Sequence, residues 1–87
     1  MKLKYEFVVN EVADKFVAVP MGDGAEELNG FIKMNDVGAA IFECLKNGTD
    51  EEEIIKVLLS KFEGTKEEAQ ECFNSFTQKL ADAGVLE

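Results

Sequence analysis

The pattern of hydrophobic and polar positions changes near Asn35. Before this residue, short runs rich in Val and Phe are separated by segments that contain Gly, Pro and polar residues, a pattern that favours strands. After it, hydrophobic residues recur at intervals of three and four, which is the period of an α-helix. We therefore expect a sheet from the first part of the chain and helices from the second.

Two of the early runs predict a β-hairpin. The runs Tyr5–Val12 and Phe16–Pro20 flank Ala13–Lys15, a short polar turn. Pro20 cannot donate a hydrogen bond to a neighbouring strand, so we expect the second strand to end there. The segment Met21–Gly30, with glycines near both of its ends, is predicted to be a loop.

A third short strand is predicted over Phe31–Asn35. Side chains alternate across a strand, so Ile32 and Met34 share one face while Phe31 and Lys33 share the other. A lysine in this short and mostly apolar strand suggests that the strand lies at an edge of the sheet.

The first predicted helix begins with Asn35 or Asp36 as its N-cap and ends at Asn47–Gly48. Its hydrophobic stripe consists of Val37, Ala40, Ile41, Cys44 and Leu45. The second helix is expected to open at Thr49–Glu52 with a capping box, in which Thr49 and Glu52 satisfy each other's backbone N–H groups. Its hydrophobic face consists of Ile54, Ile55, Leu58, Leu59 and Phe62.

The third predicted helix opens with a second capping box, Thr65–Glu68, and ends at Gly84. Its hydrophobic positions fall on one narrow stripe of the helix, which consists of Ala69, Cys72, Phe73, Phe76, Leu80 and Ala83. The short apolar tail Val85–Leu86 follows and is expected to fold back onto the domain.

The order of elements predicts an α+β domain over residues 1–87, in which a three-stranded antiparallel sheet is followed by three helices (βββααα). Two or three short helices and a small antiparallel sheet are the parts of a winged helix-turn-helix, so we expect that architecture.

Composition removes several functions. Nine Lys and no Arg stand against eighteen acidic residues, and the net charge of −9 has the wrong sign for a protein that neutralises phosphates. Residues 35–87 alone carry −7. Without His there is no imidazole base, no triad and no HExxH site. We therefore expect no nucleic-acid partner, no cofactor or metal and no catalysis, and favour a module that binds protein or peptide.

Cysteine usage and the N-terminus agree with a cytoplasmic location. Cys44 and Cys72 each stand alone among apolar residues, without the close spacing of a zinc or redox pair, and are interpreted as buried small hydrophobes. The N-terminus meets acidic residues at once and has no long apolar stretch, so neither a signal peptide nor a membrane span is predicted.

The residues around the third strand resemble a known family. The run LNGFIKMNDVGA at residues 28–39 is similar to the strand-into-helix segment of the PqqD family, Phe-Asn-Gly-Met-Ile-x-Leu-Asn-Glu-Thr-Gly-Ala. The ending LADAGVL at residues 80–86 fits as well. Asp36 and Val37 depart from the usual Glu-Thr, and Phe42 stands where the family often has Trp.

This resemblance implies a peptide chaperone. Members of the family, also called RiPP recognition elements, are winged-helix domains that bind the leader of a ribosomally made precursor peptide. They present it to a modifying enzyme, often a radical SAM protein with an auxiliary iron–sulfur (SPASM-type) domain. In the founding system the product is pyrroloquinoline quinone, and relatives serve other peptide products. The resemblance allows a monomer or a dimer, and the loop at residues 21–30 would serve as a hinge for domain swapping.

The family's groove runs between the third strand and the third helix, where an extended peptide can add a fourth strand to the free edge. Carried onto this chain, the expected peptide-binding residues are Phe31, Ile32, Lys33, Met34, Ala69, Cys72, Phe73, Phe76 and Leu80. Phe76 and Leu80 are interpreted first as core residues that pack on the sheet, which leaves Cys72 and Phe73 as the better groove candidates. Lys33 either protects the strand edge or orients an acidic residue of the peptide.

Two other functions remain open on the sequence alone. A winged-helix interaction or regulatory domain would bind another protein through its second helix. A free-standing enzyme would use Cys44 or Cys72 as a nucleophile and would need an exposed thiolate with a lowered pKa. The acidic runs at the starts of the second and third helices suit the helix dipole and would also attract a basic leader or a basic patch on an enzyme.

Overall fold

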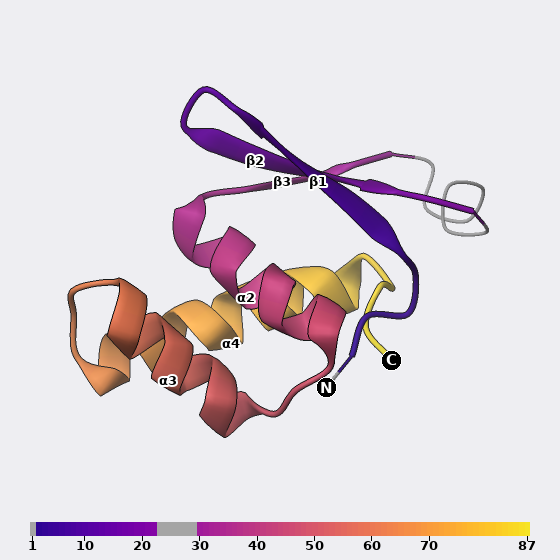
Figure 1. The fold of residues 1–87 in the computed structure, drawn as a ribbon. Coiled ribbons are helices and arrows are strands. Elements are labelled where there is room, and N and C mark those ends of the chain that lie inside the picture. Colours follow the sequence, from indigo (N-terminus) through magenta and orange to yellow (C-terminus); the bar gives the residue numbers. More distant parts are fainter. Residues whose placement is uncertain (1, 23–29) are drawn as a thin grey trace.

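The computed structural model describes residues 2–22 and 30–87, and it begins with an antiparallel sheet. Strand β1 (Phe7–Val12) pairs with β2 (Lys15–Pro20), and β2 pairs with β3 (Ile32–Met34), so the strand order is β1-β2-β3 (Figure 1). This order places β2 in the centre and β3 at an edge, as the lysine in β3 suggested. The loop predicted at Met21–Gly30 lies largely outside the described residues.

The hairpin turn has only two residues between the strands. Val12 pairs with Lys15, and Ala13 adopts a positive φ of 57°, the left-handed conformation that tight hairpin turns require. Alanine reaches this conformation only with steric cost, because its Cβ approaches the following carbonyl oxygen.

Three helices follow the sheet, as predicted: α2 (Asp36–Asn47), α3 (Glu51–Lys61) and α4 (Lys66–Asp82). Asn35 caps α2 by accepting a hydrogen bond from the amide of Gly38 at 2.8 Å. The expected capping box is confirmed at α4, where the Thr65 hydroxyl and the Glu68 carboxylate accept from each other's amides at 3.1 and 3.0 Å.

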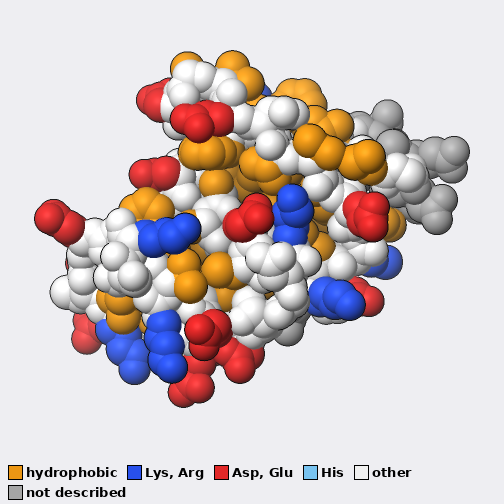
Figure 2. Space-filling model, viewed as in Figure 1, with side chains coloured by type: hydrophobic (Ala, Val, Ile, Leu, Met, Phe, Trp, Pro, Cys, Tyr) orange, Lys and Arg blue, Asp and Glu red, His pale blue; other side chains and the backbone are white. Residues whose placement is uncertain are grey.

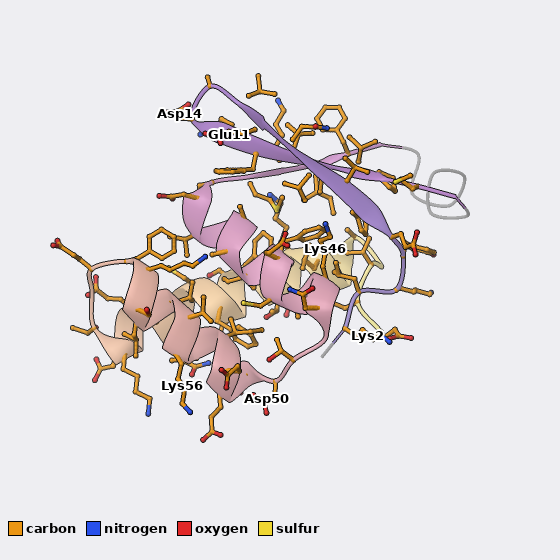
Figure 3. The ribbon with its side chains drawn as sticks, viewed as in Figure 1. Lys2, Glu11, Asp14, Lys46, Asp50 and Lys56 are labelled. Carbon is orange, nitrogen blue, oxygen red and sulfur yellow. The ribbon has the colours of Figure 1, made fainter. Side chains whose placement is uncertain are left out.

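The capping box expected at Thr49–Glu52 is wrong. The N-cap of α3 is Asp50, whose carboxylate accepts from the Glu53 amide at 2.9 Å (Figure 3). Thr49 and Asp50 are both good N-caps, and neighbouring side chains decide between them. With Asp50 as the N-cap, Glu51, Glu52 and Glu53 form the first turn, where their charges suit the helix dipole, and Ile54 follows fully buried.

The core lies between the sheet and the helices, and α2 is the central helix (Figure 1). The inward face of the sheet meets α2 through Phe7 and Phe42, whose rings pack edge to face at 5.1 Å. The core also includes Ile41, Leu45, Ile54, Leu58, Phe73 and Leu80 from the three helices. The opposite face of the sheet is open, with Val8, Val19 and Phe31 exposed.

The C-terminal tail folds back, as expected. Val85 is fully buried, and Leu86 forms a β-bridge with Leu3 near the other end of the chain. The amide of Lys4 donates to the Val85 carbonyl at 2.7 Å. Among the described residues, no helix combines the length and the apolar character that crossing a bilayer requires.

Candidate functional site

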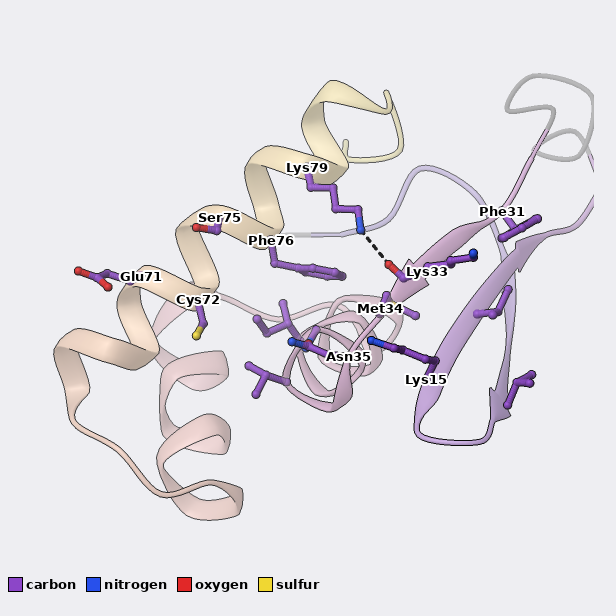
Figure 4. Close-up of a pocket in the computed structure, with 15 residues that line it drawn as sticks. Lys15, Phe31, Lys33, Met34, Asn35, Glu71, Cys72, Ser75, Phe76 and Lys79 are labelled. Atoms are coloured by element: carbon purple, nitrogen blue, oxygen red, sulfur yellow. Dashed lines mark hydrogen bonds between the residues drawn. The ribbon is translucent and has the colours of Figure 1, made fainter.

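A groove of about 920 Å³ opens between the free edge of β3 and helix α4 (Figure 4). Hydrophobic side chains from every neighbouring element line it: Val12, Val17, Phe31, Met34, Val37, Ile41, Cys72 and Phe76. Figure 2 shows hydrophobic side chains exposed along the sheet and in the hollow beneath it. A cleft of this size, apolar and open along one side, fits an extended peptide segment better than a small polar metabolite.

Phe76 forms the helical wall of the groove and is held there by two contacts. Its ring packs edge to face against Phe42 with centroids 6.5 Å apart. It also lies directly over Gly38 in the first turn of α2, where a Cβ would be only 2.9 Å from the ring atom Cε1. The absence of a side chain at Gly38 therefore allows Phe76 to approach α2 and keeps the groove open.

The edge of β3 presents its backbone to the groove at Lys33. Lys33 lies opposite Val17 of β2, yet its carbonyl oxygen accepts a hydrogen bond from the Lys79 ammonium of α4 at 2.8 Å (Figure 4). That carbonyl therefore points away from β2. In an antiparallel ladder the N–H and C=O of one residue point to the same side, so the Lys33 N–H also faces the free edge.

The groove is locally basic although the protein is acidic. The described residues that line it include three lysines, Lys15, Lys33 and Lys79, and a single carboxylate, Glu71. The side chain of Lys33 points away from α4 and lies over the Phe31 ring, with its Nζ 5.9 Å from the centroid. Residues 35–87 as a whole carry −7, so this positive lining runs against the charge of the surrounding helices.

Five of the nine predicted residues line this groove, and four do not. Phe31, Lys33, Met34, Cys72 and Phe76 border it. Ile32, Ala69, Phe73 and Leu80 are buried in the core. The expected division of α4 is thus reversed at its aromatic positions: Phe73 is only 3% exposed and packs in the core, whereas Phe76 faces the groove.

Sequence reasoning missed the polar rim of the groove and the contribution of the hairpin. Ser75 and Lys79 line it from α4, and Lys15 lines it from the start of β2. Helical periodicity could have identified Ser75 and Lys79, because together with Cys72 and Phe76 they follow intervals of three and four residues and so lie on the same side of α4. Lys15 carries no such signal, because only the pairing of β2 with β3 brings it near the edge.

The two cysteines are free and differ in their surroundings. Burial raises the pKa of the Cys44 thiol above its ordinary value of 9.0. A raised pKa is the opposite of what a nucleophilic cysteine needs. Cys44 is half-buried against the core, whereas Cys72 is exposed and borders the groove, so the interpretation of both cysteines as buried is correct only in part for Cys44 and wrong for Cys72. Among the described residues no three His, Cys, Asp or Glu side chains come together as metal ligands would.

The sequence also matches a family model described as coenzyme PQQ synthesis protein D (PqqD), over residues 25–86. The chain belongs to the PqqD family. This confirms the resemblance noted at residues 28–39, and the matched range contains β3 and all three helices, which form both walls of the groove.

One solved structure extends the likeness to the hairpin that the PqqD match leaves out. It is described as TbiB1 in complex with the TbiA(beta) leader peptide, and it superposes with a TM-score of 0.75. The alignment covers 100% of this chain and 95% of that chain at 22% sequence identity, so this PqqD-family protein shares the whole fold of TbiB1. A comparison with curated proteins gives no match.

Proposed function

We propose that this PqqD-family protein binds the leader segment of a ribosomally made precursor peptide and presents it to a separate modifying enzyme. The observation that carries the proposal is the free edge of β3 beside an apolar groove that α4 closes on the other side. The similarity in fold to a protein solved with a leader peptide supports the same use of that groove.

Strand addition explains how one groove can hold an extended peptide. A peptide lying along β3 would pair with the outward N–H and C=O of Lys33, and its side chains would alternate between two environments. One set would lie on the open face of the sheet beside Phe31 and Val17, and the other would enter the space between β3 and Phe76. The short edge ends at Asn35, whose carbonyl already accepts from Ala39 in α2.

Apolar anchors supply most of the affinity in this arrangement. A backbone hydrogen bond contributes about 0.5–1.5 kcal/mol net, whereas a buried Leu or Phe side chain contributes about 1.5–3 kcal/mol. With so few edge groups available, we expect one or two large apolar residues of the leader to fill the space against Met34, Val37 and Phe76.

The chemistry belongs to the partner in this proposal. The modifying enzyme would be of the radical SAM type with an auxiliary iron–sulfur domain, as in other PqqD systems, and this chain would hold no cofactor. Glu52, Glu53 and Glu67 on the first turns of α3 and α4 are exposed and do not line the groove, and they could meet a basic surface of that enzyme.

Titration of the ¹⁵N-labelled protein with a synthetic leader tests the proposal. Candidate leaders are the N-terminal segments of short peptides encoded near the gene. We expect the amide signals of Phe31 and Lys33 to shift most, together with those around Phe76. No shift at these amides with any leader encoded nearby would refute strand addition, and shifts confined to α3 would favour an interaction domain instead.

A proline substitution at the edge of β3 makes this test more specific. Lys33→Pro removes the outward N–H but no ladder hydrogen bond to β2, so the sheet should persist while peptide affinity falls. Lys33→Ala keeps the N–H and loses only the side chain, and it serves as the matched control. Independently of protein folding, N-methylation along the peptide should weaken binding at every second position, because alternate N–H groups face β3.

A further inference from the structure

Lys79 occupies the backbone group that an added strand would use. Its ammonium donates to the Lys33 carbonyl at 2.8 Å, across 46 positions of sequence, and the contact bridges the groove from α4 to β3 (Figure 4). A peptide that pairs with Lys33 must offer its own N–H to this oxygen. The ammonium of Lys79 then has to leave the position that it holds in the free protein.

Among the described residues that line the groove, none has a carboxylate close enough to accept a hydrogen bond from the displaced ammonium. Glu71 is the one acidic residue among the described residues that line it. Glu71 lies two helical turns from Lys79 on α4, about 12 Å along the helix axis, and its side chain points away from β3. Lys79 is exposed, so water can hydrate the displaced ammonium, whereas a peptide carboxylate at this position would replace the lost acceptor with a charged hydrogen bond.

We propose that Lys79 exchanges the Lys33 carbonyl for a carboxylate of the bound peptide, and that this exchange makes the groove selective for extended segments with Asp or Glu on the side that faces α4. This inference rests on the proposed function. Side chains of the bound peptide alternate between the two faces of the sheet. The acidic residue is therefore a direct neighbour, in the peptide sequence, of the residue that pairs with Lys33, and its side chain lies on the same face as the apolar anchors that point toward Phe76.

The charges around the groove support the same ligand chemistry. Lys15 and Lys33 border the other side of the free edge, so an acidic strand would meet lysines on both faces. In the free protein the Lys79 contact also protects the exposed edge, because it satisfies a carbonyl that could otherwise pair with a second sheet.

Affinity measurements on a double-mutant cycle test the exchange. The probes are fluorescein-labelled synthetic peptides that cover each candidate leader encoded near the gene, with each Asp or Glu replaced in turn by Asn or Gln. The proteins are the wild type, Lys79→Gln, and Lys56→Gln as a control lysine on α3 outside the groove (Figure 3). Lys79→Arg tests whether the charge alone is sufficient.

We expect one acidic position at which the amide peptide binds the wild type about tenfold more weakly, the loss typical of a charged hydrogen bond. Lys79→Gln should bind the acidic peptide more weakly than the wild type does, by a similar factor. It should bind the amide peptide as tightly as the wild type does or more tightly, because glutamine holds the Lys33 carbonyl less strongly than lysine does. Lys56→Gln should change neither affinity. Raising the salt concentration should narrow the difference between the two peptides on the wild type.

The outcomes separate this inference from the function on which it rests. A leader that does not bind the wild type refutes the proposed function. A leader that binds with no acidic position coupled to Lys79, or a Lys79→Gln variant that weakens acidic and amide peptides equally, overturns the exchange and leaves leader binding intact. If Lys79→Gln does not fold, the affinities of the acidic and amide peptides for the wild type and for Lys79→Arg still test the exchange. Both proteins must prefer the acidic peptide, and this preference must decrease as the salt concentration rises.

Discussion

Gly38 is the position at which one methyl group should change the shape of the groove. A Cβ added there would be 2.9 Å from Cε1 and 3.1 Å from Cδ1 of Phe76, and 3.3 Å from the Asn35 side-chain oxygen. Carbon atoms pack comfortably at about 3.5–4.0 Å. The ring of Phe76 must therefore retreat by about 0.6 Å or more, away from α2 and into the space that the peptide would occupy.

Two opposing effects set the stability of Gly38→Ala. Alanine gains up to about 1 kcal/mol over glycine from helix propensity, somewhat less in the first turn of a helix. Overpacking against a ring that also touches Phe42 costs about 1–3 kcal/mol. We expect a net destabilisation of up to about 2 kcal/mol, and a weaker affinity for the leader because the ring narrows the groove.

A double-mutant cycle with Phe76→Ala isolates the steric term. Without the ring, the clash with Phe76 disappears and the helix-propensity gain is opposed only by the 3.3 Å contact with the Asn35 side-chain oxygen, so Gly38→Ala should be neutral or stabilise the Phe76→Ala protein by up to about 1 kcal/mol. The contact with Asn35 is the same in both backgrounds and cancels from the cycle.

Thermal and urea denaturation of the four proteins, followed by circular dichroism, measures this coupling. Each 1 kcal/mol shifts the midpoint of a domain of this size by about 4–8 °C. An effect of Gly38→Ala that is equal in the two backgrounds would refute the argument that Gly38 accommodates Phe76.

Four further outcomes follow from local geometry. Ala13→Gly should raise the unfolding midpoint, by about 1 kcal/mol in stability, because glycine adopts the positive φ of the turn without strain; a lower midpoint would contradict this. Thr65→Ala should cost about 1 kcal/mol in the same assay by removing the acceptor for the Glu68 amide, and Thr65→Ser should restore it. Burial raises the pKa of Cys44, so the folded state holds its proton more tightly than the unfolded state; the contribution of Cys44 to stability should be constant below about pH 8 and fall as the pH rises through 9 and above, and urea titrations of Cys44→Ala should lack that part of the decline. Cys72 should react with iodoacetamide in the free protein and be protected by the leader, and unchanged labelling in the complex would place the peptide elsewhere.

The order of elements was predictable because each one carries local signals. Alternation, the proline at the end of β2 and the N-caps define three strands and three helices without reference to tertiary contacts. The incorrect N-cap predicted for α3 shows that such local signals do not define a helix start to the exact residue. Thr49 and Asp50 are adjacent and both suit an N-cap, so the sequence pattern alone does not distinguish between them.

The direction in which each α4 side chain points was less predictable. Phe73 and Phe76 fall on the same hydrophobic stripe, and helical periodicity gives both the same status. They differ in their neighbours: Phe73 packs in the core, whereas Phe76 lies over Gly38 of α2 at the wall of the groove. Gly38 precedes the first residue of α4 by 28 positions, so no local signal in the sequence identifies it as the neighbour of an aromatic ring.

Net charge and local charge lead to opposite expectations for the ligand. A chain with −9 repels an acidic peptide at long range, and the acidic first turns of α3 and α4 would favour a basic one. Lys15, Lys33 and Lys79 come from β2, β3 and α4, and only the fold gathers them around one groove. Repulsion over the rest of the surface is screened within about 8 Å at physiological salt, whereas a carboxylate in the groove lies within hydrogen-bonding reach of an ammonium. An acidic leader therefore loses little during the encounter, and the three lysines at the groove provide the favourable charge that the rest of the surface lacks.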